Sequence, residues 1–285
     1  MRALSIGDLV LVSDGVPTSG FLIQTPIEGL DGPNHRTNAY AKAGRDGQTI
    51  SSQFYDARLV TFVGKVYGDT FAEFETNRKA LIAATAISRD DNGFPEPIRV
   101  SFTTMAEQEY YFDAYFDKPE LALEDPITGE FMVTAVCTDP FIYAQTGATS
   151  SAISPPSGGG WEIPTILPFT SAASSGGSVT LNNAGSVTAW PIITLTGPLT
   201  TPVLTNTTTG TYLQLDYTIA MGDEVIIDMI GHTITLDGAS LISTKTAVSE
   251  WWGLEPGNNS VTLTTSSSSD EGSMTVAYNV PYIGV

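Results

Sequence analysis

The residues of this chain that could do chemistry are few and far apart in the sequence. The two histidines, His35 and His232, and the single cysteine, Cys137, do not share a catalytic or metal-binding spacing. A nucleophilic site would need a residue on a strained turn such as Gly-x-Ser-x-Gly, which the sequence does not contain. Cys137 lies in the alternating run EFMVTAVCTDP, where a buried thiol that packs like alanine is expected. We expect no catalytic residue, no cofactor and no metal site.

The acidic residues do not predict an active site either. The run Asp90-Asp91-Asn92-Gly93 lacks the alternating acids and the downstream glutamate of a calcium loop, so we interpret it as the turn that ends a helix. Adjacent acids such as Glu124 and Asp125 point apart on a strand or turn and would not flank one glycosidic bond. A glycan hydrolase is therefore the least supported function.

Trp251 and Trp252 form the most conspicuous aromatic pair, just before the turn-rich run LEPGNN. Exposed tryptophans beside Asp and Asn can hold sugar rings by stacking and hydrogen bonding. We favour the interpretation that one tryptophan fills a core and that the turn leads into the next strand. Glycan contact through Trp251 and Trp252 remains the alternative hypothesis.

Charge and composition divide the chain of 285 residues into two halves. Only one of the 12 basic residues, Lys245, lies after residue 144, and the later half is rich in Ser, Thr and Gly. We expect a domain at 1–144, a Ser/Gly/Pro-rich linker at 145–178 that is partly docked, and a second domain at 179–285. The net charge of −19 disfavours tight binding to nucleic acid. We expect no membrane insertion and no signal peptide.

The first half predicts an α+β domain with an antiparallel, barrel-like sheet. A capping box at Thr70 and Glu73 begins one amphipathic helix that runs to Ile87 and covers the sheet through residues such as Phe74 and Leu81. Turn chemistry at 13–17 separates the first two strands. The expected strands are residues 4–12, 21–23, 59–67, 98–103, 109–116 and 130–138.

Two segments of this half are candidates for contact with another subunit. Residues 24–52 are polar, Gly-rich and without clear periodicity, and form either an inter-subunit contact or a solvated loop. Residues 110–116 are aromatic on both faces, so this strand is either buried twice or packed on another subunit. The candidate interface residues are Arg36, Lys42, Arg45, Asp46, Tyr111 and Tyr115.

The second half predicts an all-β sandwich of jelly-roll type. Strands recur about every ten residues with Gly- and Asn-rich turns between them, and no helical pattern is present. The expected strands are residues 179–182, 190–195, 212–215, 224–229, 232–236, 260–264 and 273–278. The fold class is therefore mainly β in two domains.

Short motifs along both halves resemble one family. They are GRDG at 44–47, YDARLVTFVG at 55–64, the helix with Phe74 and Arg78, NAG at 183–185, WPIITLTGP at 190–198, Asn206 with Thr209-Gly210, Gly222-Asp223, Ile227-Asp228 and WGLEPGNN at 252–259. In order and spacing they are similar to those of the distal tail proteins, or minor tail proteins, of long-tailed siphophage-type bacteriophages. The departure is the linker, SSAISPPSGGGW and SAASSGGS, which is longer and richer in serine.

The resemblance implies a structural virion protein that forms a homohexameric ring at the tail tip, or baseplate. The tail-tube-like N-terminal domain would form the ring, and the galectin-like sandwich would point outward. The implied partners are the tail tube protein, the tail-tip hub protein and receptor-binding or side proteins, with genomic DNA passing through without tight binding. Assembly would take place in the cytoplasm of the bacterial host. The alternative is a carbohydrate-binding protein that recognises a host surface glycan and so serves host attachment.

Overall fold

The computed structural model describes residues 3–12, 19–156 and 177–285, so the turn expected at 13–17 and the linker around Trp161 lie outside the described residues. The chain forms two compact units, one of residues up to 146 together with Tyr282–Val285, the other of Gly147–Pro281. The last four residues, expected in the second domain, are therefore part of the first unit. Their backbone reaches it through β26 (Pro281–Tyr282), the last strand of the first unit's main sheet.

The first unit is built on a ten-stranded sheet that closes on itself. The strand order is β11-β12-β6-β3-β2-β1-β9-β10-β13-β26, and a further pairing of β12 with β10 closes the barrel. Strand β11 consequently lies outside the closed part, as an edge strand. The bounds are β1 Ala3–Ile6, β2 Leu9–Val12, β3 Gly20–Ile23, β6 Arg58–Tyr67, β9 Ile98–Thr103, β10 Glu109–Phe116, β11 Glu120–Asp125, β12 Thr128–Cys137 and β13 Ile142–Ala144.

The first expected strand, residues 4–12, is in fact a hairpin. Strands β1 and β2 pair antiparallel with Leu4 opposite Leu11, around the turn at Gly7 and Asp8. Gly7 has a φ of 55°, a left-handed conformation that glycine adopts without steric cost. Strand β2 then pairs parallel with β3 through Val12 and Leu22. The first antiparallel pair is thus formed within residues 4–12, and the strands on either side of residues 13–17 pair in parallel instead.

The single α-helix of the described residues begins as predicted and ends early. Helix α1 (Phe71–Ala84) is capped by Thr70, whose hydroxyl accepts a hydrogen bond from the Glu73 amide at 3.2 Å. Phe74 and Leu81 are buried in the core, as expected for the apolar stripe. The helix stops three residues before Ile87, and residues 90–93 instead form the turn between β7 (Ser88–Arg89) and β8 (Pro95–Glu96).

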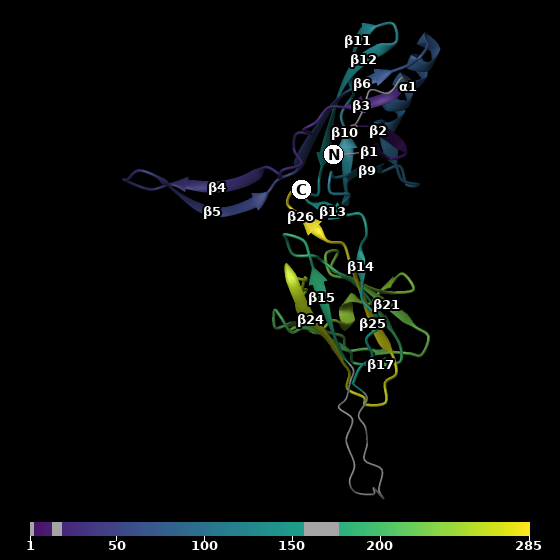
Figure 1. The fold of residues 1–285 in the computed structure, drawn as a ribbon. Helices are drawn as coiled ribbons and strands as arrows, with labels where there is room; N and C mark the ends of the chain where they lie inside the picture. The colour runs from purple at the N-terminus through teal and green to yellow at the C-terminus, as the bar shows by residue number, and fades with distance from the viewer. Residues whose placement is uncertain (1–2, 13–18, 157–176) are drawn as a thin grey trace, which may run out of the picture. The chain divides into compact units, whose positions relative to one another are not determined.

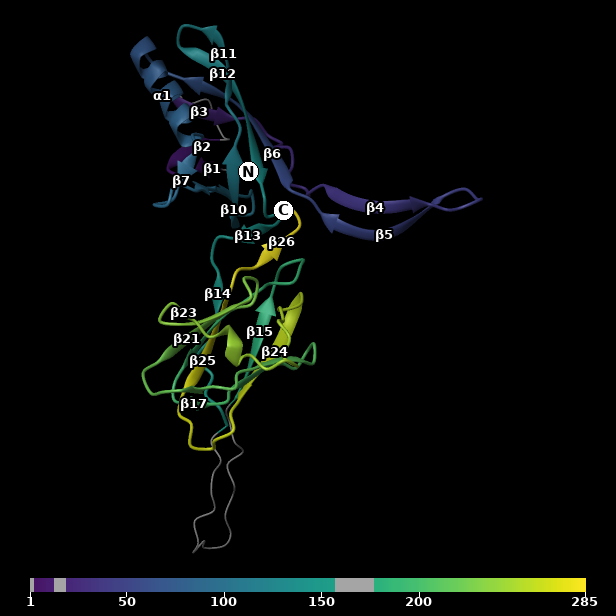
Figure 2. The same cartoon turned by 180° about the vertical axis from the view of Figure 1, so that it is seen from behind.

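Residues 24–52, expected to form an irregular loop, include most of a long hairpin. Strands β4 (His35–Ala41) and β5 (Gln48–Tyr55) pair antiparallel and project away from the barrel of the first unit (Figures 1 and 2). Nearly every side chain of the two strands is exposed. Because neither face is buried, the strands show no alternation of apolar and polar residues, and periodicity could not reveal them. We call this hairpin the arm.

The second unit is a sandwich of two main sheets. One has the order β14-β25-β16-β21-β22-β23 and the other β15-β24-β18-β19, with a separate pair of β17 and β20. The fold class predicted from the sequence is confirmed: mainly β, with one barrel-like sheet and one sandwich. The bounds are β14 Ala148–Thr149, β15 Ser178–Asn183, β16 Ile192–Thr196, β17 Leu199–Thr200, β18 Val203–Asn206, β19 Thr211–Gln214, β20 Thr218–Ile219, β21 Glu224–Asp228, β22 Thr233–Leu236, β23 Ala239–Ser240, β24 Gly257–Thr264 and β25 Ser273–Tyr278.

Candidate assembly interface

The arm carries large apolar side chains that no described part of its own chain covers. Tyr40, Ile50 and Phe54 are 65%, 60% and 57% exposed. Arg36 pairs with Phe54, so Arg36, Tyr40 and Phe54 share one face of the arm, and Ile50 lies opposite Ala39 on the other. An isolated two-stranded hairpin is marginally stable in water. The arm is therefore a candidate surface for contact with a partner.

The tip of the arm is basic. The turn closes with a hydrogen bond from the Lys42 amide to the Gly47 carbonyl at 3.1 Å, which leaves Arg45 and Asp46 exposed between them. Residues 35–55 contain three basic residues and one acidic residue, in a chain of net charge −19. Of the predicted interface residues, the structure thus places Arg36 on the shaft of the arm and Arg45 and Asp46 at its tip.

A buried arginine lies three residues after the arm, at the start of β6, and the sequence indicated it only as part of a motif. Arg58, at the start of β6, is fully buried. Its Nε donates to the Pro140 carbonyl at 2.8 Å, one terminal nitrogen donates to the Gly29 carbonyl at 2.6 Å, and the other donates to the Ile283 carbonyl. Burial lowers the pKa of Arg58 from its ordinary value. Since all these acceptors are main-chain carbonyls distant in sequence, only the tertiary structure identifies this cluster.

Tyr111, predicted as an interface residue, is covered by its own chain. It is 6% exposed, its ring stacks on Tyr143 with centroids 5.6 Å apart, and the Arg99 guanidinium lies 3.9 Å from its centroid. Asp113 holds Arg99 in place by an ion pair of 2.9 Å. Burial on both faces, one of the two alternatives, thus accounts for Tyr111. Tyr115, farther along the strand, is half-buried.

The two tryptophans have different environments in the second unit. Trp252 is 2% exposed, so it fills the core and is not available to a glycan, which corrects that assignment. Trp251 is half-exposed and stacks on His232, with ring centroids 4.8 Å apart and planes 9° apart. The Lys245 ammonium lies 5.7 Å from the centroid of the Trp251 ring. Of the pair, only Trp251 presents surface to a ligand.

Three buried asparagines hold the turn that follows Trp252. Asn183 donates to the Leu254 carbonyl at 2.9 Å, Asn206 donates to the Gly253 carbonyl at 2.9 Å, and Asn259 donates to the Glu255 carbonyl at 2.7 Å. The side-chain oxygens accept hydrogen bonds from nearby main-chain amides. Buried amides are stable only when so paired. These asparagines belong to the motifs that resemble tail proteins, which gives those motifs a structural explanation.

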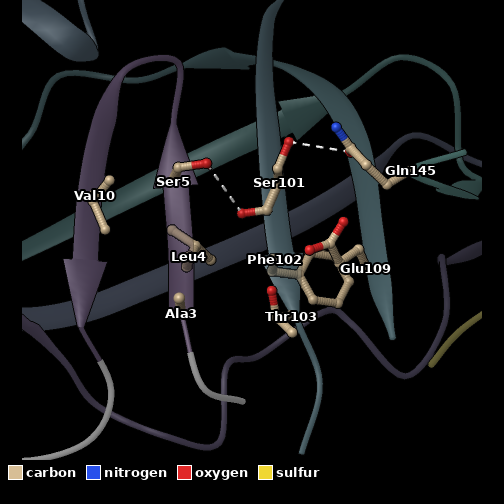
Figure 3. A pocket seen from close by; sticks show the side chains of 9 residues that line it. All are labelled: Ala3, Leu4, Ser5, Val10, Ser101, Phe102, Thr103, Glu109 and Gln145. Atoms are coloured by element: carbon tan, nitrogen blue, oxygen red, sulfur yellow. Dashed lines mark hydrogen bonds between the residues drawn. The ribbon is translucent and has the colours of Figure 1, made fainter. Parts of the chain in front are cut away.

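The hollow at the outer side of β1, β9 and β10 does not bring reactive groups together among the residues that the structure describes. A hollow of 260 Å³ lies over β1, β9 and β10, and Ser101 in its lining donates to the Gln145 side chain at 3.4 Å. Figure 3 shows the lining residues, among which Ser5 also donates to the Ser101 carbonyl. Burial raises the pKa of Cys137 to about 12, so its thiol is protonated and unreactive at neutral pH. Within the described ranges, no group of His, Cys, Asp and Glu is arranged to hold a metal ion. In the same part of the chain, no helix is long and apolar enough to cross a membrane.

Comparisons with known proteins agree with this architecture. The family model described as siphovirus-type tail component, C-terminal domain, matches residues 184–282. The Dit protein of phage SPP1, described as a paradigm of the hub adsorption apparatus in phages that infect Gram-positive bacteria, is similar in structure: the TM-score is 0.65 at 16% identity, over 92% of this chain and 93% of that chain. The phage P2 baseplate in its activated conformation with calcium aligns with a TM-score of 0.48 at 10% identity, over 97% and 98% of the two chains. No curated protein sequence matches the chain.

The family match and the structural match cover different lengths of the chain. The family model covers most of the second unit, and the likeness of fold to SPP1 Dit extends over both units. The resemblance to distal tail proteins that the sequence indicated is confirmed, and residues 184–282 of the second unit are similar to the C-terminal domain of siphovirus-type tail components.

Proposed function

We propose that six copies of this chain form a ring at the distal end of a phage tail. The ring joins the tail tube protein to the tail-tip hub protein and to the receptor-binding or side proteins of the baseplate. The role is structural rather than catalytic. The protein is assembled in the host cytoplasm and resides in the virion at the tail tip.

The observation that carries this proposal is the arm. Its strands are exposed on both faces and present Tyr40, Ile50 and Phe54 to solvent. A surface of this kind on one side of a subunit, bound by a different surface of the next subunit, gives a head-to-tail contact. Such contacts close into rings when the rotation between subunits divides the circle evenly.

The net charge supports passage of DNA through the ring. Each chain carries a net charge of −19, so a ring of six chains carries six times that charge, and the acids among its bore-facing residues make the wall of the bore acidic. Phosphate groups are repelled from an acidic wall, which lets DNA pass without binding. Basic substitutions of acids that face the bore should slow ejection of DNA, and unchanged ejection would argue against this part of the proposal.

The test is native mass spectrometry of the purified chain over a concentration series. A species of six times the 30.2 kDa of one chain is expected. The double variant Tyr40→Ser with Phe54→Ser should lose this species and leave a folded monomer, because it removes apolar surface that a partner would cover. The matched control is Met221→Ser, since Met221 is 79% exposed on the second unit. A chain that stays monomeric at every concentration, with and without tail tube protein, would refute the proposed ring.

A further inference from the structure

The outer face of β6 and β12 is a second uncovered apolar surface on the first unit. Inward-facing residues of the two strands, such as Phe62 and Val133, are fully buried, whereas Leu59, Val63 and Met132 are exposed. Val63 lies opposite Met132 in the ladder, so the two side chains are neighbours on the same face. We call this surface, with the adjoining edge strand β11, the β6–β12 face.

One end of the β6–β12 face is acidic. Lys65 lies opposite Glu130 in the ladder, and its ammonium is 2.7 Å from Glu124 and 3.4 Å from Glu130. Glu120 of β11 lies opposite Met132 and shares its face. Two carboxylates therefore contact the Lys65 ammonium, and a third, that of Glu120, lies on the same face beside Met132. The face is apolar near Leu59 and carries a net negative charge near Lys65.

Along the arm, as along the β6–β12 face, an apolar part is followed by a charged part, but the charge on the arm is positive. Its shaft carries Tyr40 and Phe54 on one face, and its tip carries Lys42 and Arg45 with a single acid, Asp46. Gln48 and Phe54 are six residue steps apart and therefore roughly 20 Å apart along the strand, at about 3.3 Å for each step. Leu59 and Lys65 are also six steps apart, so they are separated by a similar length. The distance between the apolar part and the charged part is therefore similar on the two surfaces.

The arm does not cover the β6–β12 face of its own chain. Strand β5 ends at Tyr55, three residues before β6 begins at Arg58, and the arm leads away from the barrel in both views of the molecule (Figures 1 and 2). Both surfaces are exposed in the single chain. Two different surfaces that complement each other on one subunit produce a head-to-tail contact between copies.

We propose that the arm of one copy docks on the β6–β12 face of the next copy. Tyr40 and Phe54 cover Leu59, Val63 and Met132, and Lys42 and Arg45 at the tip meet Glu120, Glu124 and Glu130. This inference rests on the proposed ring and adds to it the surface that receives the arm.

Crosslinking between copies tests the contact directly, because Cys137, the one native cysteine, is fully buried. A Tyr40→Cys chain is mixed with a Val63→Cys chain and treated with a short bis-maleimide. A crosslinked dimer is expected in the mixture at several times the yield found with either chain alone. The matched control is Val10→Cys in place of Val63→Cys, since Val10 is a strand valine that is even more exposed, at 57%.

Charge reversal provides a second measurement that does not depend on crosslinking geometry. Lys42→Glu with Arg45→Glu should raise the concentration at which half of the chain is assembled by about tenfold. Adding Glu124→Lys with Glu130→Lys to that chain should restore assembly, because the charges at both surfaces are then reversed. Circular dichroism and the melting temperature confirm that each variant is folded.

The outcomes separate the inference from the proposed function. A hexamer with the Tyr40–Val63 crosslink and rescue by the double reversal supports both. A hexamer in which Tyr40→Cys crosslinks no better to Val63→Cys than to Val10→Cys, and in which the reversal does not rescue, overturns the docking surface and leaves the ring intact. A native chain that does not assemble with any tail protein overturns the proposed ring and the docking surface with it.

Discussion

The guanidinium of Arg58 donates a hydrogen bond to the main-chain carbonyl of Ile283, 225 residues later in the sequence. This bond attaches the last residues of the chain to the start of β6. Gly284 continues the attachment, since a Cβ at that position would lie 2.0 Å from the Asp31 carbonyl. The end of the described chain is therefore an integral part of the unit that bears the arm.

Arg58→Met should destabilise the first unit by about 3 kcal/mol or more. The substitution removes the buried donor that hydrogen-bonds to the carbonyls of Gly29, Pro140 and Ile283, and a hydrogen bond to a charged group contributes about 1.5–3 kcal/mol. Urea denaturation monitored by far-ultraviolet circular dichroism measures the change in the free energy of unfolding. Arg78→Met is the control, because Arg78 forms a partly exposed ion pair with Glu75 and should change stability by less than about 1 kcal/mol. Equal effects of the two substitutions would contradict the structural role of Arg58.

Tyr111→Asp should abolish folding of the first unit rather than assembly alone. It places a carboxylate between Arg99 and Tyr143 at a position that is 6% exposed, and a buried charge is costly even beside a cation. Tyr111→Phe keeps the ring stacking and should retain both fold and assembly. Thermal denaturation together with native mass spectrometry distinguishes the two effects. A Tyr111→Asp chain that is folded but monomeric would instead support a role of Tyr111 in the contact between subunits.

Trp252→Ala should cost the second unit about 3–5 kcal/mol, whereas Trp251→Ala should cost considerably less. Trp252 is buried in the core, and Trp251 is half-exposed against His232. Denaturation curves of the two variants measure the difference. Trp251→Ala should leave the hexamer unchanged, so loss of binding to host cell-wall glycan in this variant would support carbohydrate recognition as an additional role. Identical glycan binding by Trp251→Ala and the native chain would show that Trp251 does not contact the glycan.

Cys137 should not react with thiol reagents in the folded protein. Burial raises its pKa from an ordinary value near 9 to about 12, so the thiolate is scarce at pH 8. Because the folded state holds this proton more tightly than the unfolded state, the contribution of Cys137 to stability falls as the pH rises above about 9. Reaction with Ellman's reagent should be complete in denaturant and absent without it. Rapid reaction of the native chain would show that the thiol is accessible.

Much of the secondary structure was predictable because, in those strands and in the helix, the spacing of apolar residues in the sequence matches the spacing of buried residues in the structure. Strands β9 and β10 begin and end at the expected residues, and the capping box at Thr70 and Glu73 starts helix α1. The arm was missed as a hairpin because hydrophobic alternation reports a buried face, and the arm has none. Strand β18 (Val203–Asn206) was missed because it is short and ends in a buried asparagine.

The sequence by itself determined the division into two β-rich units, the acidic charge and the likeness to tail proteins. These properties depend on composition, on local periodicity and on the order of short motifs, all of which are present in the linear chain. Only the tertiary structure decided that Arg58 binds Ile283, that Tyr111 is covered by Arg99, and that the arm and the β6–β12 face are both uncovered. Such relationships depend on which distant segments of the chain come into contact. Every residue has a main-chain carbonyl, so the residue types near it in the sequence do not reveal which donor it binds.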